Sequence, residues 1–226
     1  MGRLEPEPGV LEALRVEIEA CRRCPRLVAW RESVAHAPRA SFADQIYWGR
    51  PVAGFGDPRA RLVVVGLAPA AHGGNRTGRV FTGDRSGDWL YGALFRAGYA
   101  NQPTSTERDD GLQLDGCWVT AAVRCAPPAN RPTPAEREAC RPYLERELAA
   151  LTQCRVIVAL GQFATAAIAT LLDLRPRPHF AHLAEHALPG ATLLCSYHPS
   201  QQNTFTGTLT QPMFDAVFAR ARQLGA

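Results

Sequence analysis

The feature that most constrains the fold of this chain is the apolar run LVVVG, Leu62 to Gly66, which passes without a break into a polar loop ending at Asp84. A short run that is apolar at every position is typical of a strand buried on both faces of a sheet. In open α/β sheets, ligands bind beyond the carboxyl ends of the strands. The sequence therefore predicts a core strand over residues 61–66 that leads directly into a functional loop.

The rest of the chain alternates between strand and helix patterns. Further strands are predicted at residues 117–123, 154–160 and 191–196, with a short one within 174–182, and helices at residues 86–99, 134–151 and 161–172, near the C-terminus and twice before residue 35. Thr133, Pro134 and Glu136 form the capping-box pattern that starts the central helix, and residues 35–57 are predicted as an ordered loop. This alternation predicts a parallel sheet covered by helices on both faces, in one domain over residues 1–226.

The basic residues are unusual, because all 25 are arginine and the chain contains no lysine. Guanidinium groups suit bidentate contacts with phosphate, and the net charge of +4 favours an anionic partner. An enzyme without lysine has no side-chain amine with which to form a Schiff base. No apolar run reaches the roughly 18 residues of a membrane span, and the acidic, proline-containing start does not resemble a signal peptide. We therefore expect an intracellular, cytoplasmic protein without membrane contact.

Seven cysteines in an intracellular chain favour a metal or cluster site over disulfides. Cys117, Cys154 and Cys195 lie in or beside predicted strands, where cysteine usually acts as a small apolar residue. Four others lie outside strand interiors: Cys21 and Cys24 in a C-x2-C pair, Cys125 in a proline-rich loop, and Cys140 in the following helix. Four thiolates suit either tetrahedral zinc or a [4Fe-4S] cluster, and the alternative is a set of unligated thiols.

Four segments, taken in this order, resemble the uracil-DNA glycosylase superfamily, and most of all its iron–sulfur-containing family 5 (type b) branch. They are GLAPA at residues 66–70, GRVFTGD at 78–84, RCAPP at 124–128 and HPS at 198–200. The resemblance implies a three-layer α/β/α sandwich with a central parallel sheet of about four strands. It also implies a [4Fe-4S] cluster on the four cysteines outside the strands, and hydrolysis of the N-glycosidic bond of uracil in DNA.

The chain departs from better-known members of that superfamily at two places. Where they carry an acidic or amide residue that acts on water after the first strand, this chain has Leu67 and Ala68. Where they tend to have an asparagine that reads uracil, the second strand has Ala121. Both departures predict that other residues supply these functions, and that specificity extends to other deaminated bases such as hypoxanthine.

Excision of a base requires a flipped nucleotide, a surface on which the base stacks, stabilisation of the leaving base, and a positioned water. The resemblance implies that the flipped base stacks on Phe81, and the alternative for Phe81 is a core phenylalanine. It also implies that His198 donates a hydrogen bond to the leaving base. Asp84 is the carboxylate nearest the first strand and is predicted to orient water or stabilise positive charge on the sugar; a helix N-cap is its alternative. Asn130 is predicted as a second polar group for water or base, with a plain turn role as the alternative.

The remaining candidates surround these four. The predicted pocket also includes Gly66, Leu67, Ala68, Pro69, Asn75 and Ala121. The predicted DNA contacts are the arginines Arg76, Arg79 and Arg85, and a loop that enters the minor groove, formed by Pro199, Ser200, Gln201, Gln202 and Asn203. The alternatives for Asn75 are a role in a turn or a contact with phosphate. The alternative for each arginine is an ordinary solvent-exposed side chain without a DNA contact.

These features predict a monofunctional DNA glycosylase that acts as a monomer on double-stranded DNA containing uracil and leaves an abasic site. On DNA it would be associated with the nucleoid. The alternative is an iron–sulfur DNA-binding module that senses damage without catalysis. A loop that binds nucleotide phosphate is disfavoured, because GGNRTGR at residues 73–79 matches neither G-K-[ST] nor G-x-G-x-x-G.

Overall fold

A computed structural model describes residues 8–226 of the chain. In this part of the chain, six strands form one sheet in the order β1-β3-β2-β4-β6-β5. They are β1 Phe55–Gly56, β2 Leu62–Gly66, β3 Cys117–Ala121, β4 Val156–Leu160, β5 Glu185–Leu188 and β6 Ala191–Ser196. The four central strands are parallel, whereas β1 and β5 pair antiparallel at the two edges.

The prediction of about four parallel strands is confirmed for the centre of the sheet, and the two edge strands are a correction to it. β1 has only two residues, within the segment 35–57 predicted as a loop. β5 follows residues 174–182, where the short strand is predicted, and its side chains alternate between exposed and half-buried. Neither edge strand carries a continuous apolar run. An edge strand pairs with a neighbour on one side only, so fewer of its side chains are buried.

Eight α-helices and two 3₁₀ helices lie in the described residues. They are α1 Pro8–Glu19, α2 Pro25–His36, α3 Gly74–Thr77, α4 Arg85–Arg96, α5 Pro134–Ala150, α6 Gln162–Leu171, α7 Gln201–Phe205 and α8 Gln211–Gly225, with η1 Ala40–Phe42 and η2 Pro128–Asn130. The capping box of α5 is confirmed: Thr133 Oγ1 accepts from Glu136 N at 3.2 Å, and Glu136 Oε2 accepts from Thr133 N at 2.7 Å. No helix in residues 8–226 is both long and apolar enough to cross a membrane.

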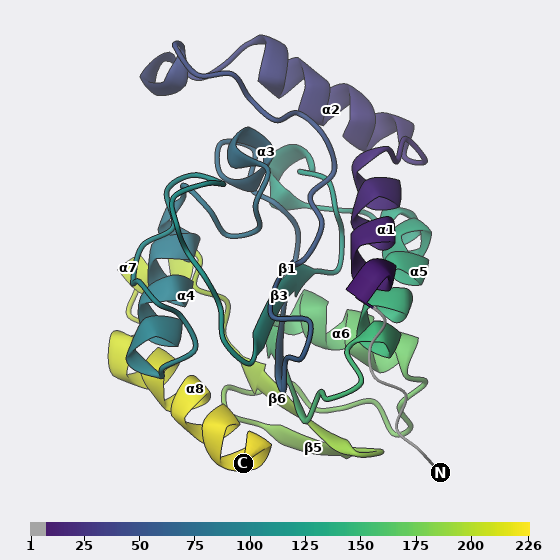
Figure 1. Ribbon diagram of the computed structural model, residues 1–226, viewed down its shortest axis with the longest axis vertical. Helices are drawn as coiled ribbons and strands as arrows, with labels where there is room; N and C mark the ends of the chain where they lie inside the picture. Colours follow the sequence, from purple (N-terminus) through teal and green to yellow (C-terminus); the bar gives the residue numbers. More distant parts are fainter. Residues whose placement is uncertain (1–7) are drawn as a thin grey trace.

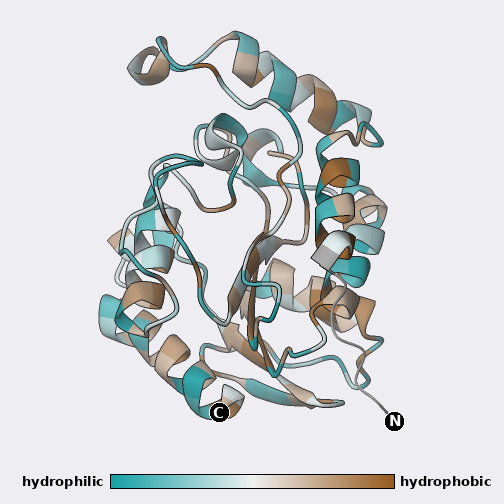
Figure 2. Cartoon of the chain, viewed as in Figure 1, coloured by the Kyte–Doolittle hydropathy of each residue, from teal (hydrophilic) through white to brown (hydrophobic). Residues whose placement is uncertain are grey.

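The sheet is the middle layer of three. Along β2, Val64 packs with Leu90 of α4 and Phe214 of α8, whereas Val63 packs on the opposite face with Ile168 of α6. This alternation follows from the period of two along a strand, and because both faces are covered, every residue of β2 is buried. Figure 1 shows α4 and α8 on one side of the sheet and α1, α5 and α6 on the other. In Figure 2 brown marks the central strands, and the covering helices carry both brown and teal turns.

The carboxyl ends of the parallel strands meet at one edge of the sheet, and this edge positions the site. Gly66 at the end of β2 pairs with Ala121 at the end of β3. The pairing continues beyond the strands, because Ala122 N donates to Gly66 O and Val123 N donates to Leu67 O, each at 3.0 Å. The loops that follow β2 and β3 therefore leave the sheet side by side, and the loop after β6 leaves at the same edge, beyond β4.

Candidate functional site

The centre of the site is formed by Phe81 and His198, which lie beside the end of β2. A Cβ at Gly66 would be 2.6 Å from atoms of the Phe81 ring, so only glycine lets the ring lie against the strand end. Phe81 itself has a positive φ of 52°, which is rare for an aromatic residue. Its ring centroid is 5.9 Å from that of His198, with the two planes inclined by 33°. The two rings are thus neighbours at the edge predicted to bind the ligand.

His198 is placed by the segments that follow β6 and β4. Its backbone oxygen accepts a hydrogen bond from Asn203 Nδ2 at 2.9 Å, and a Cβ at Gly161 would lie 3.3 Å from its own Cβ. Burial lowers the pKa of His198 to about 4, because the surrounding protein disfavours the charged ring. The imidazole is therefore neutral at physiological pH, with one N–H to donate.

Asp84 caps the start of α4, so its N-cap alternative is confirmed. Its Oδ1 accepts from Gly87 N at 3.0 Å. Its Oδ2 lies against the loop that follows β2, since a Cβ at Gly73 would be 2.0 Å from this oxygen. Burial raises the pKa of Asp84, while the backbone N–H groups of Gly87 and Ser86 act in the opposite direction. One carboxylate thus caps a helix with one oxygen and faces the candidate loop with the other.

Asn130 lies further out, at the end of η2. It is exposed and has a left-handed φ of 54°, a conformation that asparagine tolerates. Its loop is tied to α2, because Arg26 Nη2 donates to Arg131 O at 3.1 Å. Within residues 8–226 no hydrogen bond joins Asn130 to Asp84 or His198. The structure therefore places Asn130 in an exposed turn.

Asn75 and two of the predicted phosphate contacts have structural roles instead. Asn75 is fully buried in α3, and its Nδ2 donates to Arg31 O at 3.2 Å, which joins α3 to α2. Arg76 is buried and donates to Gln45 Oε1 at 2.6 Å and to the backbone oxygens of His72 and Gly83. This guanidinium is thus occupied within the fold.

Arg79 is likewise buried, and it forms an ion pair with Asp110 at 2.7 Å. It also donates to Thr82 Oγ1, Ser105 Oγ and Arg108 O. Because the guanidinium is occupied by these partners, it does not face solvent. The sequence pattern around Arg76 and Arg79 resembles a basic loop, but tertiary contacts bury both side chains.

Arg85 differs from these two, because it lies at the rim of the site beside an exposed ring. Its Cζ is 4.2 Å from the centroid of the Phe205 ring, and the Phe205 side chain is 68% exposed. Phe205 ends α7, the short helix that forms from the predicted insertion loop. Ser200 caps this helix by accepting from Asn203 N at 3.3 Å, and Gln201 and Gln202 are exposed.

The first turn after β2 is apolar, and its Ala68 packs against the cluster of Leu27, Val123, Cys125 and Cys140. Leu67 and Ala68 are half-buried, while Pro69 and, at the end of β3, Ala121 are buried. A Cβ at Gly74 would be only 3.0 Å from Pro69 Cβ, so the turn folds tightly onto α3. Leu67 and Ala68 are apolar, so the polar groups described at this edge come from more distant segments.

One residue pair beside the site is not among the predicted residues. Tyr47 Oη lies 3.0 Å from His72 Nδ1, and His72 belongs to the loop that follows β2. Burial lowers the pKa of His72, and the nearby cations Arg39 and Arg76 act in the same direction. The sequence could have indicated His72, because it lies in the loop after β2. It could not have indicated Tyr47, which comes from a distant segment that has no recognisable pattern.

The four cysteines predicted as ligands do come together. Cys21, Cys24, Cys125 and Cys140 line one small cavity between α2, the loop after β3 and α5. Burial raises the pKa of the Cys125 and Cys140 thiols, so thiolates there need positive neighbours. No three Cys, His, Asp or Glu side chains in residues 8–226 form a group arranged to hold a metal ion.

Two buried arginines line the same cavity. Arg31 is 2% exposed, its Nη1 donates to Cys125 Sγ at 3.0 Å, and its Nε has no hydrogen-bond partner within the described chain. Arg124 is also buried and pairs with Glu147 at 2.7 Å. Four sulfur atoms and a buried N–H without a partner in residues 8–226, around one cavity, suit a cofactor that carries negative charge.

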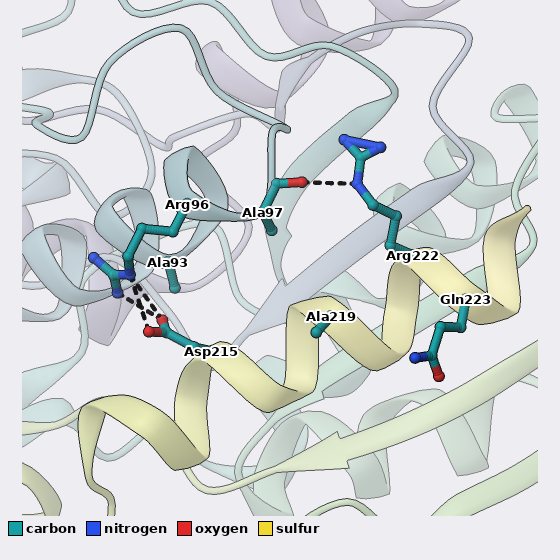
Figure 3. Close-up of a pocket in the computed structure, with 7 residues that line it drawn as sticks. All are labelled: Ala93, Arg96, Ala97, Asp215, Ala219, Arg222 and Gln223. Atoms are coloured by element: carbon teal, nitrogen blue, oxygen red, sulfur yellow. Dashed lines mark hydrogen bonds and ion pairs between the residues drawn. The ribbon is translucent and has the colours of Figure 1, made fainter.

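A groove of about 510 Å³ between α4 and α8 lies apart from these residues. Its lining includes the ion pair of Arg96 with Asp215 at 2.6 Å and the hydrogen bond from Arg222 Nε to Ala97 O at 2.7 Å, both drawn in Figure 3. These contacts hold the two helices together. The groove contains none of the predicted site residues, and we assign it no ligand.

Comparison with known proteins gives a consistent result. The family model described as the Uracil DNA glycosylase superfamily matches residues 53–222. The chain is 53% identical to a Type-5 uracil-DNA glycosylase of Mycobacterium leprae over 220 residues, covering 96% of each chain. It is 54% identical to the protein of the same name from Thermus thermophilus, covering 94% of this chain and 97% of the relative. With that of Pyrobaculum aerophilum it shares 47% identity over 201 residues.

Proposed function

The chain belongs to the uracil DNA glycosylase superfamily, and from this premise we propose that it is a uracil-DNA glycosylase working through the pocket at Phe81 and His198. The observation that carries this proposal is the pairing of the two rings over Gly66, 5.9 Å apart. An aromatic surface and a neutral hydrogen-bond donor at one strand end are what a flipped base and its departing anion require.

Phe81 provides the stacking surface for the flipped uracil. Because Gly66 has no side chain, the ring lies directly against the end of β2, and the base would stack on its open face. Leu67 and Ala68, which follow Gly66 directly, are apolar and offer no polar side-chain group to the base. Such a pocket holds a planar base more by shape than by hydrogen bonds, which supports a range of bases wider than uracil, including hypoxanthine.

His198 stabilises the base as it leaves. Breaking the N-glycosidic bond places negative charge on the base, and a neutral imidazole can donate to the developing oxyanion without first taking up a proton. Burial keeps this ring neutral, since it lowers the pKa of His198 to about 4. The hydrogen bond from Asn203 to the His198 backbone fixes the segment from which the ring extends.

Asp84 supplies the negative charge near the sugar. Its Oδ2 faces the Gly73 loop, and we assign this oxygen to the water or to the positive charge that develops on the deoxyribose. Asn130 contributes a second polar group when DNA closes over the exposed turn. These two residues then replace the polar group that is missing at Leu67 and Ala68.

The rim contacts DNA through α7 and the segment before it. Gln201 and Gln202 are exposed there, and Arg85 lies over Phe205 in a position to reach a phosphate. We propose that this segment enters the minor groove of double-stranded DNA beside the flipped nucleotide. Since the chain has no lysine, it forms no Schiff base with the sugar and leaves an abasic site.

The cysteine cavity fits a [4Fe-4S] cluster held by Cys21, Cys24, Cys125 and Cys140. The four thiols line one cavity, and the buried Arg31, which donates to Cys125 Sγ, offsets part of the negative charge that four thiolates and a cluster would carry. When bound, such a cluster supplies no reaction step here and joins the start of α2 to the loop after β3. We also propose that the enzyme acts as a monomer in the cytoplasm, on nucleoid DNA.

A base-release assay tests the proposed function. Purified protein is incubated with duplex oligonucleotides that contain uracil or hypoxanthine, and free base is measured alongside abasic sites. We expect release of both bases, and no adduct trapped by borohydride. Binding to these duplexes without release of any base would support the damage-sensing alternative, and release of uracil alone would remove the wider specificity.

A further inference from the structure

The segment between α2 and Trp48, residues 37–47, carries an isoleucine that packs against nothing. We call this segment the arm; Figure 1 shows it projecting beyond the body of the molecule, next to α3. The side chain of Ile46 is 98% exposed, far more than any other large apolar residue in the part of the chain that the structure describes. Single exposed apolar residues are common on protein surfaces, so exposure alone assigns no role.

The arm is tied to the pocket loop on both sides of Ile46. On one side, Gln45 Oε1 accepts from Arg76 Nη1 at 2.6 Å; on the other, Tyr47 Oη lies 3.0 Å from His72 Nδ1. Trp48 N then donates to Arg76 O at 2.8 Å. The bonds of Gln45 and Tyr47 anchor both neighbours of Ile46 to the loop, and the 98% exposed Ile46 side chain points away from it.

A second contact steadies the arm nearer its tip. The Arg76 guanidinium lies 4.2 Å from the ring centroid of Phe42 in η1. The same guanidinium donates to Gly83 O at 3.0 Å, next to the candidate catalytic Asp84. Arg76 therefore joins the arm to the loop that carries Asp84, and these contacts of its neighbours fix the place of Ile46 relative to that loop.

We propose that Ile46 is an apolar contact to duplex DNA at the edge of the pocket, packing against the base pair or deoxyribose next to the flipped nucleotide. This inference rests on the proposed function, since it needs a flipped nucleotide in the pocket. Apolar side chains commonly fill the gap when a base leaves the stack. The arm places such a side chain on a segment other than α7, so the opened duplex is contacted from two segments.

The arm carries one positive and one negative side chain, so its charge does not favour a contact with phosphate. Arg39 and Asp44 are both exposed on it, and their charges are opposite. An uncharged contact releases no counterions, so loss of the Ile46 side chain changes affinity without changing its salt dependence. Loss of Arg85, a proposed phosphate contact, changes both.

The test uses Ile46→Ala in the full-length protein, with Val16→Ala as the matched control, because Val16 is an exposed aliphatic residue of α1 at 56%. The probe is a duplex with a tetrahydrofuran abasic analogue, which binds but cannot be cut, and affinity is measured by fluorescence anisotropy over a range of salt. We expect Ile46→Ala to weaken duplex binding by roughly five- to twentyfold, part of the effect of burying a whole isoleucine. Its salt slope and its binding to single strands should match wild type.

The control results decide between the explanations. Arg85→Gln should lower the salt slope by about one, which shows that the assay detects phosphate contacts. Equal affinities of Ile46→Ala, Val16→Ala and wild type would overturn the inference. So would sedimentation showing a wild-type dimer that Ile46→Ala converts to a monomer, because a second copy would then cover Ile46. Failure of wild type to release uracil, with Ile46-dependent binding intact, would overturn the proposed function alone.

Discussion

The phenyl ring of Phe81 and the imidazole of His198 lie 5.9 Å apart, centroid to centroid, although 117 positions separate them along the chain. Phe81 comes from the loop after β2 and His198 from the end of β6. The two meet because parallel strands end at the same edge of the sheet. The pocket is thus a product of topology, and its parts can be tested one at a time.

Removing the His198 side chain tests the hydrogen bond to the leaving base. We expect His198→Ala to lower the single-turnover rate of uracil release by roughly 10²- to 10³-fold, as loss of one such donor does elsewhere. The variant should still bind a duplex that contains the abasic analogue. His179→Ala, at an exposed histidine, is the control and should be unchanged. A His198→Ala rate within twofold of wild type would remove this residue from the mechanism.

The neutral state of His198 predicts a pH dependence of stability. Burial lowers its pKa to about 4 in the folded protein, while the unfolded chain takes up a proton near pH 6.5. Between these values the unfolded state binds more protons, so the contribution of His198 to stability falls as pH falls from about 6.5 to 4. Thermal melting at a series of pH values should therefore show a shallower acid decline for His198→Gln than for wild type. Parallel plots of melting temperature against pH for the two proteins would contradict the lowered pKa of His198.

Substitution can separate the two proposed roles of Asp84, which are capping α4 and acting in catalysis. Asn caps helices about as well as Asp does, so Asp84→Asn should melt close to wild type while losing activity. Asp84→Ala should lose activity too, and also about 1 kcal/mol of stability with the cap. Uracil release and thermal melting are measured on both variants. Full activity in Asp84→Asn would leave this residue with the cap alone.

Gly66 tests how closely the stacking ring must approach the strand. A Cβ here would be 2.6 Å from the Phe81 ring, so Gly66→Ala displaces the ring. We expect kcat/KM for uracil release to fall by at least about tenfold, equal to roughly 1.4 kcal/mol. Gly9→Ala is the control, because a Cβ at Gly9 meets nothing within 4 Å. Unchanged kcat/KM in Gly66→Ala would argue against stacking on Phe81.

The cysteine cavity predicts bound iron and acid-labile sulfide in equal amounts. Cys125→Ser should lose both, together with visible absorption, and should melt at a lower temperature because α2 is no longer joined to the loop after β3. Cys195→Ser is the control, since Cys195 is buried in β6 away from the cavity. Zinc in place of iron in protein purified without oxygen would instead support the tetrahedral site that the cysteine pattern leaves open.

Much of the scaffold follows from local sequence. The run at residues 62–66, the capping box at Thr133 and the alternation of strand and helix patterns predict the four parallel strands and the helices that cover them. These signals are local, because periodicity and capping depend on residues within a few positions of each other. The two edge strands lack them, since β1 is too short and β5 too exposed to carry an apolar run.

The sequence by itself determined the parallel core, the edge at which the candidate loops emerge, and the cysteines that line one cavity. Only the tertiary structure decided that Arg76 and Arg79 are buried anchors, that Asn75 joins α3 to α2, and that Tyr47 meets His72. A guanidinium looks the same in the sequence whether it faces solvent or an internal carboxylate. Its role depends on partners far along the chain, such as Asp110 for Arg79, and these are brought close only by the fold.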